Sequence, residues 1–272
     1  MPLRLHEWPA PVQKKIQALD PRRMPRHIAF IMDGNGRWAR QRRRRRLMGH
    51  REGIKTAKQI IRFCHDVGGI ECITLFAFST ENWKRPKLEI AGLMLLLKYF
   101  LRKETDEMVE NDIRFRTIGR TDEFPSFVQR ELQRTADATA HCRSFTLNIA
   151  LNYGARREIL DAALELHRRL AEGQVRRDQV DPSYFEKLLY TADLPDPDLL
   201  IRTSGELRIS NFLLWQLAYA ELYVTQVLWP DFGPSELLDA ILDYQHRERR
   251  FGGLIGRPPA EGSPSAGGRV HS

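Results

Sequence analysis

The sequence predicts an α/β fold, a single domain with a central, mostly parallel β-sheet flanked by helices. Short apolar runs alternate along the chain with longer amphipathic segments, which is typical of repeated strand–helix units. No internal repeat and no Gly-, Pro- or Ser-rich linker interrupts residues 26–253, so we expect one domain there. Residues 1–25 are expected to form a loosely attached N-terminal arm, and residues 254–272 a disordered tail.

Each expected element follows from a local pattern. The apolar runs expected to form strands are short and lead into turns or polar loops; they are residues 27–32, 71–78, 113–119, 145–154 and 196–205. Apolar residues at helical spacing predict helices over residues 11–19, 53–68, 86–111, 125–141, 155–173 and 236–251. Gly68 and Gly69 end the second of these helices, and Pro86 begins the third.

The composition excludes several classes of protein. Hydrophobic residues make up 42% of the chain and charged residues 29%, as in an ordinary globular protein. The cysteines are widely spaced, so we expect no disulfide framework or zinc site, and a cytoplasmic location. No signal-peptide core is present, and the most apolar run, residues 90–101, is shorter than the ~20 residues that cross a bilayer.

The formal net charge of +8 indicates anionic partners: a nucleic acid, an anionic membrane or a phosphorylated substrate. The arginine run Arg42 to Arg46 fits a solvated helix face or a nucleic-acid patch. Nucleic-acid sites that tolerate many sequences usually interleave aromatic residues for base stacking, and none lies between Trp38 and Phe63. The run therefore gives little support to a nucleic-acid partner.

Three polar stretches directly follow predicted strands: "DGNGRW" (33–38), "STENWKRP" (79–86) and "RTSGELRISN" (202–211). In an open parallel sheet, ligands bind at the carboxyl ends of the strands. These stretches lie far apart in the sequence, but the sheet would bring them to one edge. We therefore expect them to form a single active site.

The first stretch combines a carboxylate with features that bind phosphate. Gly34 and Gly36 let the backbone approach a ligand and leave amide groups free for oxyanions, and Arg37 adds a positive charge. Asp33 would repel a phosphate unless a cation lay between them, and Mg²⁺ held by one carboxylate and by substrate phosphates resolves that conflict. The alternative, that Asp33 and the glycines only form the turn, stays open on these residues alone.

The third stretch and the segment after it contribute further charges. Arg202, Arg208 and Ser210 form a second cluster that suits a diphosphate. Glu221 stands in the otherwise apolar "WQLAYAELY", where a carboxylate is expected to be paired, bound to a metal or located at a subunit contact.

Five motifs, in this order, closely resemble the cis-prenyltransferases, the family that includes the bacterial undecaprenyl diphosphate synthases. They are "HIAFIMDGNGRWA", "GHREG", "LFAFSTENWKRP", "TLNIALNYGARREI" and "DLLIRTSGELRISNFLLWQLAYAELYVTQVLWPDF". The likeness runs from about His27 to Gly253. It implies a homodimer in which each central sheet encloses an apolar tunnel.

The resemblance also implies Mg²⁺-dependent addition of isopentenyl diphosphate to an allylic diphosphate such as farnesyl diphosphate, giving a long polyprenyl chain, most simply undecaprenyl diphosphate. It implies that Asp33 and Asn82 are catalytic and that Asp33 and Glu221 hold Mg²⁺. The residues that it implies for substrate binding are Gly34, Asn35, Gly36, Arg37, Trp38, Arg46, His50, Ser79, Thr80, Glu81, Trp83, Arg85, Arg202, Arg208, Ile209 and Ser210.

Some alternatives stay open. Trp38 and Trp83 could be ordinary core aromatic residues instead of substrate-binding residues. His50 could likewise have a purely structural role. A shorter or longer product is the alternative within the family, and a basic nucleic-acid-binding protein is the alternative outside it. The basic surface also suggests peripheral contact with the inner face of the membrane.

The tunnel needs apolar walls. We expect it between the strand bearing Ile73, Leu75 and Ala77 and one face of the helix over residues 86–111. That helix face consists of Ile90, Leu93, Met94 and Leu97. Ala77, the smallest of these side chains, is placed near the tunnel mouth.

Overall fold

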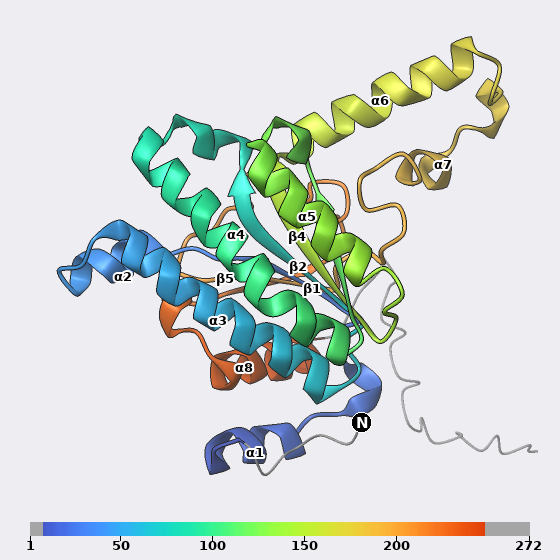
Figure 1. Cartoon of the computed structure of the whole chain (residues 1–272). Coiled ribbons are helices and arrows are strands. Elements are labelled where there is room, and N and C mark those ends of the chain that lie inside the picture. The colour runs from blue at the N-terminus through green and yellow to red at the C-terminus, as the bar shows by residue number, and fades with distance from the viewer. Residues whose placement is uncertain (1–7, 248–272) are drawn as a thin grey trace, which may run out of the picture.

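The computed structural model describes residues 8–247 and has a six-stranded parallel sheet at its centre (Figure 1). The strands are β1 (His27–Ile31), β2 (Cys72–Ser79), β3 (Ile113–Ile118), β4 (Phe145–Tyr153), β5 (Leu199–Arg202) and β6 (Glu221–Val224). Their order across the sheet is β3-β4-β2-β1-β5-β6, and all neighbouring pairs are parallel. The predicted α/β class and the five predicted strands are confirmed, and β6 is an additional edge strand.

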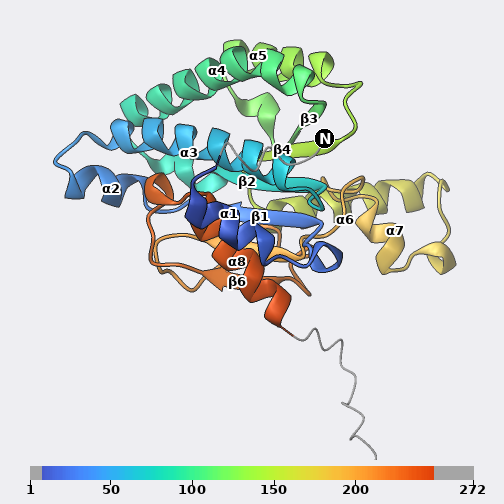
Figure 2. The ribbon, with the colours of Figure 1, turned by 90° about the horizontal axis from the view of Figure 1, so that it is seen from below.

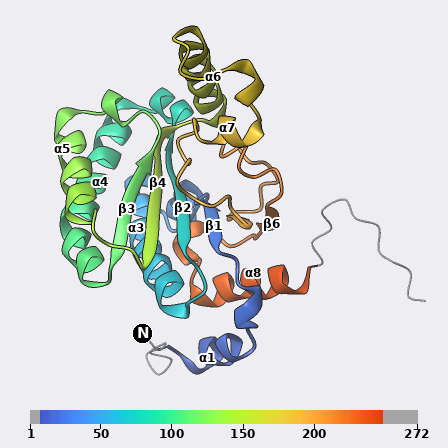
Figure 3. The same ribbon diagram turned by 90° about the vertical axis from the view of Figure 1, so that its right-hand side faces the viewer.

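The helices are α1 (Ala10–Gln17), α2 (Asn35–Gln41), α3 (Arg46–Val67), α4 (Lys87–Glu110), α5 (Ser126–Ala138), α6 (Ala155–Ala171), α7 (Pro182–Glu186) and α8 (Pro234–His246). The helices α3, α4, α5 and α8 pack on one face of the sheet. Phe212, Leu213 and Leu217 cover much of the other face, and α6 and α7 extend away from the sheet (Figure 3). None of the helices described between residues 8 and 247 is long and apolar enough to cross a membrane.

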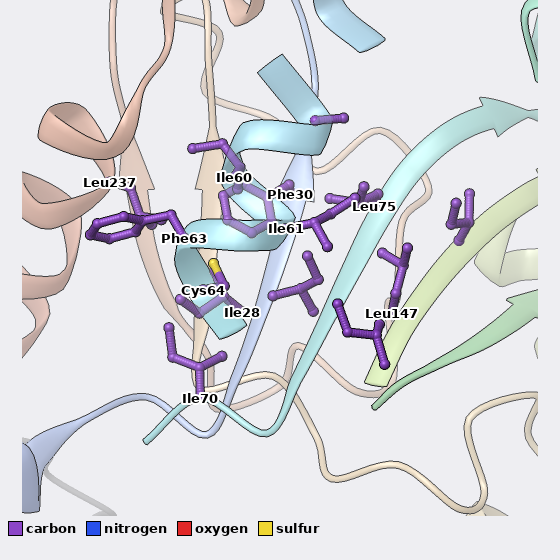
Figure 4. Packing of buried hydrophobic residues seen from close by; sticks show 14 of the residues in the cluster. Ile28, Phe30, Ile60, Ile61, Phe63, Cys64, Ile70, Leu75, Leu147 and Leu237 are labelled. Carbon is purple, nitrogen blue, oxygen red and sulfur yellow. The ribbon is translucent and has the colours of Figure 1, made fainter. Parts of the chain in front are cut away.

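The core follows from the alternation of side chains along central strands that are buried on both faces. All five residues of β1 are buried. Ile28 and Phe30 pack with Ile60 of α3 on one face (Figure 4), while Ala29 and Ile31 contribute to the apolar cluster on the other. This double burial makes β1 a rigid base for the turn that follows it.

The N-terminal region is less free than its sequence suggests. In its described part, α1 lies against α8 (Figures 2 and 3), with Val12 and Ile16 buried. Lys15 donates to Ser235 Oγ at 2.8 Å and pairs with Asp239 at 2.6 Å. The arm is therefore packed against the domain from residue 8 onward, because it buries apolar as well as charged side chains. The tail predicted over residues 254–272 lies outside the described residues.

Candidate active site

The three polar stretches meet at the carboxyl ends of the strands. Arg202, at the end of β5, donates from Nη2 to Asp33 Oδ2 at 2.9 Å, and Arg37 donates to the carbonyl of Ser204 at 2.9 Å. Asn211 Nδ2 donates to Glu81 Oε1 at 3.1 Å, which joins the second stretch to the third. The register places Ile31 beside Arg202, so the parallel sheet itself brings these loops together.

Asp33 is fixed by the backbone around it. Its carboxylate Oδ1 accepts a hydrogen bond from the Gly34 amide at 2.7 Å, and its carbonyl accepts from the Trp229 amide at 3.0 Å. Gly34 has φ +108°, and a Cβ there would lie 3.0 Å from Leu228 Cδ2. Only glycine suits this position, because other residues rarely adopt that backbone conformation.

Two arginines hold the negative charge of Asp33. Its Oδ2 accepts from Arg202 at 2.9 Å and from Arg37 at 3.3 Å. The side chain of Arg202 is only 5% exposed, and its Nη1 also donates to the Arg208 carbonyl and to Ser210 Oγ. Arg202 Nε is buried and has no hydrogen-bond partner in the described chain.

The loop after β5 holds several residues in unusual backbone conformations. Ser204, Ser210 and Asn211 have positive φ values of 81°, 50° and 62°. Non-glycine residues adopt such conformations at an energetic cost, and they occur often at ligand-binding sites. Two of these side chains make contacts at the site: Ser210 accepts from Arg202, and Asn211 donates to Glu81.

A second charged group lies at the start of α4. Glu89 is 12% exposed and accepts from Arg85 at 3.2 Å and pairs with Arg46 at 3.3 Å. His50 Nε2 lies 3.9 Å from Glu89, too far for a hydrogen bond. Burial, together with the positive charges of Arg85 and Arg46, lowers the pKa of His50 to about 4, so its imidazole is neutral at neutral pH.

Two polar cavities adjoin at Asp33. The first has a volume of about 560 Å³ and is lined by Ile31, Met32, Asp33, Asn35, His50, Phe76, Ala77, Ser79, Glu81, Asn82, Arg85, Ser210 and Asn211. The second has a volume of about 470 Å³ and is lined by Asp33, Gly34, Gly36, Arg37, Arg40, Arg44 and Arg46. Asp33 is the residue that the two cavities share. Two adjacent anions could thus face one carboxylate from different sides.

An apolar cavity of about 130 Å³ adjoins the first polar cavity. It is lined by Met32, Asn35, His50, Gly53, Ile54, Ala57, Leu75, Ala77, Phe78, Leu93, Met94, Leu96, Leu97, Phe100, Ile149, Leu151 and Trp229. Met32, Asn35, His50 and Ala77 line both cavities. Ala77 therefore stands where polar and apolar space meet.

The apolar cavity differs in detail from the predicted tunnel wall. Ile73 and Ile90 belong to the core but do not line the cavity, whereas Phe78 does. The pairing of β2 with β4 shifts register between Phe76 and Phe78, so the strict alternation on which the prediction depended breaks there.

The arginine run divides into residues with different environments. Arg42 pairs with Asp231 at 3.1 Å and lies over the Trp38 ring, 4.3 Å from its centroid. Arg44 and Arg46 line the second polar cavity together with the preceding Arg40, whereas Arg43 and Arg45 do not. The run is therefore not one uniform patch.

Several predicted site residues line neither polar cavity. Trp38 is buried and donates to Asp231 at 2.7 Å, and Trp83 donates to Asn152 at 2.7 Å and packs against Phe78. These contacts support a packing role for both tryptophans. Thr80 lies beside Gly154, Ile209 packs in the core cluster of the far face, and Arg208 is paired with Glu206 at 2.6 Å. Arg202 also lines neither cavity, although its Nη2 donates to Asp33. The remaining predicted substrate-binding residues each line one of the two polar cavities.

The described chain does not bring Glu221 to Asp33. Glu221 begins β6 beside Leu199, whereas Asp33 follows the other end of the neighbouring strands, and Glu221 pairs with Arg247 at 2.8 Å. Between residues 8 and 247 no three His, Cys, Asp or Glu side chains are grouped to hold a metal ion. Asp33 alone fits Mg²⁺ in the way common for diphosphate sites, with one carboxylate and oxygens from the substrate.

The sequence did not single out Arg40, Arg44, Glu89 or Asn211. Arg85 and Glu89 stand four residues apart, a spacing that pairs charges on a helix, and this could have identified Glu89. Arg40 and Arg44 were hidden within or beside a run whose members look alike in sequence.

Comparison with known proteins identifies relatives over nearly the whole described chain. Residues 31–252 match the family described as "Putative undecaprenyl diphosphate synthase". The isoprenyl transferase of Heliobacterium mobile is 49% identical over 261 residues, covering 93% of this chain and 99% of the relative. That of Geobacter sulfurreducens is 50% identical over 237 residues, covering 87% and 96%.

Solved structures give the same result. Lavandulyl diphosphate synthase from Lavandula x intermedia, in complex with dimethylallyl diphosphate, superposes with a TM-score of 0.83 at 37% identity, covering 85% of this chain and all of that one. A "probable undecaprenyl diphosphate synthase" from Campylobacter jejuni superposes with a TM-score of 0.69 at 34% identity, covering 84% and 99%.

The neutral His50, whose side chain is 15% exposed, predicts a pH effect on stability. An unfolded histidine gains a proton near pH 6.5, whereas folded His50 gains one only near pH 4, so stability falls as pH falls through this window. His50→Gln should reduce the slope of unfolding free energy against pH by about 1.4 kcal/mol per unit between these values. Denaturant unfolding at a series of pH values measures this slope. The exposed His167, changed to Gln, serves as the control, and an equal slope in both variants would contradict the prediction.

Proposed function

Because the chain belongs to the cis-prenyltransferase family and is a transferase of prenyl groups, we propose that it condenses isopentenyl diphosphate with an allylic diphosphate, farnesyl diphosphate, in a Mg²⁺-dependent reaction. The observation that carries the proposal is the position of Asp33 between two polar cavities, one of which adjoins apolar space. Such a site accepts two anionic head groups and one apolar chain. The proposed product is a long polyprenyl diphosphate, undecaprenyl diphosphate.

The second polar cavity suits the allylic diphosphate. Gly34 and Gly36 line it, although the Gly34 amide already donates to Asp33 Oδ1, and Arg37 and Arg46 supply charge next to Asp33. Arg40 and Arg44 add two cations there that have no ion-pair partner among residues 8–247. Asn35 and His50 line the apolar cavity and the first polar cavity, which meets the second polar cavity at Asp33. They are therefore proposed to contact the first carbons of the chain as it passes from Asp33 into the apolar space.

The first polar cavity suits isopentenyl diphosphate. Ser210 lines this cavity and accepts a 3.0 Å hydrogen bond from Arg202, and Arg208, largely exposed, can turn towards a bound diphosphate. Ser79, Glu81 and Arg85 complete its wall.

The reaction requires negative charge to develop on the departing diphosphate. Bound Mg²⁺ would supply Lewis-acid stabilisation of that charge, with Asp33 as its protein ligand. Arg37 and Arg202 already offset the charge of Asp33, and we propose that both can also donate to substrate oxygens. The resemblance implies Glu221 as a second ligand of Mg²⁺, and we keep it as a proposed ligand that would act at a subunit contact. Within one chain it lies at the opposite end of β6 from Asp33 and pairs with Arg247.

Proton removal from isopentenyl diphosphate needs an acceptor. Asn82 lines the cavity, but its amide is too weakly basic, and its Oδ1 already accepts from the Ser79 amide at 3.3 Å. We propose that Asn82 positions the substrate while a diphosphate oxygen or Asp33 takes the proton.

A homodimer is part of the proposal. Leu207, Tyr219 and Leu222 are exposed near the edge strand β6, and exposed apolar groups of this kind are typical of subunit contacts.

A cytoplasmic enzyme in peripheral contact with the inner face of the membrane fits the basic surface and the apolar product. No observation favours a nucleic-acid partner, because the arginine run does not form one basic surface: Arg42 lies over Trp38, whereas Arg44 and Arg46 line the second polar cavity.

A shorter product is the second candidate. The apolar cavity of about 130 Å³ is smaller than common ligand pockets of about 300–1,000 Å³, which favours a short chain unless α4 moves outward.

Incubation with radiolabelled isopentenyl diphosphate, farnesyl diphosphate and Mg²⁺ tests the function, with chain length read by chromatography. We expect chain elongation that a chelator abolishes. Absence of any elongated product with several allylic primers would overturn the proposal.

Asn82→Ala should lower kcat by about a hundredfold or more while changing the KM for isopentenyl diphosphate little, because positioning acts mainly on the chemical step. Steady-state kinetics measures both constants. An unchanged kcat would remove Asn82 from the mechanism.

Arg44→Ala should raise the KM for the allylic diphosphate by roughly tenfold, the effect of removing one charge-assisted hydrogen bond. Arg45→Ala is the matched control, since Arg45 has the same charge in the same run but does not line the cavity. Equal effects of the two variants would show that only the general charge of the run matters.

Ala77→Leu should shorten the product, because the larger side chain fills the junction between the polar and apolar cavities. Chromatography of the products measures chain length. Leu88→Ala, on the outer face of α4, is the control. A product of unaltered length would refute this placement of Ala77.

A further inference from the structure

The helix α4 is apolar on two faces. Its inner face contributes Leu93, Met94 and Leu97 to the apolar cavity. Its outer face presents Leu88, Leu95 and Tyr99, which are 89%, 59% and 58% exposed. An ordinary surface helix is polar on its outer side, so this second apolar face calls for a partner.

The outer face of α4, defined here by Leu88, Leu95 and Tyr99, forms a narrow line. Their spacings of seven and four residues place these three side chains on one side of the helix. Figure 2 shows α4 and α5 as the outermost layer of the molecule, with no described element covering α4. Leu47, 40% exposed, continues the apolar surface towards the arginine run, because its Cδ1 lies 2.9 Å from the position of a Cβ on Gly92.

From residue 84 to residue 103, the exposed charges around this face have one sign, before the acidic end of α4 that carries Asp106 and Glu110. Lys84 and Lys87 precede the first turn of α4 or stand in it, and both are exposed and without an ion-pair partner among residues 8–247. Lys98 and Lys103 flank the line further on, over the rings of Phe127 and Tyr99. From residue 84 to residue 103, Glu89 is the one acidic residue, and its carboxylate is turned inward to Arg46 and Arg85.

We propose that the outer face of α4 docks on an anionic membrane surface. An apolar line with flanking lysines matches a lipid bilayer, where the apolar groups enter the boundary of the acyl chains and the cations contact anionic head groups. A second copy of this chain would present the same positive charge to itself, and that disfavours it as the occupant.

The same helix then separates the apolar cavity from the lipid. Leu96 and Leu97 line the cavity, while the preceding Leu95 faces outward. A small outward movement of α4 would open the cavity towards the acyl chains. This delivery of an apolar product into lipid depends on the proposed function, whereas the docking itself does not.

Co-sedimentation with vesicles tests the proposal. The full chain should bind vesicles of phosphatidylcholine and phosphatidylglycerol more tightly than vesicles of phosphatidylcholine alone. The double variant Leu88→Glu, Leu95→Glu should weaken this binding by roughly tenfold or more, since two apolar contacts are replaced by like charges. Lys187→Glu, on an exposed residue after α7, changes the net charge by the same amount and should bind almost as the unchanged protein does.

Absence of vesicle binding, or equal binding by both variants, would overturn the proposal. So would a changed oligomeric state of the double variant without vesicles, because a second copy would then be the occupant of this face. Prenyl transfer in detergent shows that the variants are folded, since neither Leu88 nor Leu95 lines a cavity. Vesicle binding without prenyl transfer would support docking and refute the proposed function. Prenyl transfer without vesicle binding would support the proposed function and refute docking.

Discussion

The ion pair between Asp33 and Arg202 is the interaction on which the candidate site depends. It joins the ends of two adjacent parallel strands, β1 and β5, whose residues are all buried. The side chain of Arg202 is 5% exposed and that of Asp33 is 32% exposed, so the pair is buried on one side and open to ligand on the other. Removing one partner from a fully buried pair costs about 3–5 kcal/mol, and less where one partner is partly exposed.

Two carboxylates of the site, Asp33 and Glu89, each hold two arginine side chains in place. Asp33 accepts hydrogen bonds from Arg37 and Arg202, and it borders both polar cavities. At the start of α4, Glu89 forms ion pairs with Arg46 and Arg85. Each carboxylate holds guanidinium groups in place before a ligand arrives, so less conformational freedom is lost on binding. His50 stays neutral between these groups because burial and the two arginines oppose its protonation.

The sequence predicted the α/β class, five of the six strands and the convergence of the three loops, because buried parallel strands produce long apolar runs and ligand loops follow them. It missed β6, a four-residue edge strand that is only partly buried and begins with a glutamate. It also expected strict alternation along β2, which the register shift after Phe76 breaks. Local patterns do not reveal such shifts, because the partner strand determines them.

In the candidate site, too, the sequence identified some residues correctly and could not reveal the environment of others. Asp33, Gly34, Arg202 and Ser210 were identified from their motifs, and the structure places them within one site. The different environments of Arg42 and Arg44 could not be predicted, because they depend on Asp231 and Trp38, which pack beside Arg42. The resemblance implies that Glu221 acts with Asp33, and this stays a prediction; within one chain, the register of β6 puts Glu221 at the other end of the strand.

Titration of inorganic diphosphate into the protein by calorimetry, with Mg²⁺ and with a chelator, tests the central role of Asp33 most directly. The account predicts that Mg²⁺ strengthens binding to the unchanged protein, and that Asp33→Asn binds diphosphate equally well with and without the metal ion. A variant that kept the full gain in affinity from Mg²⁺ would contradict it.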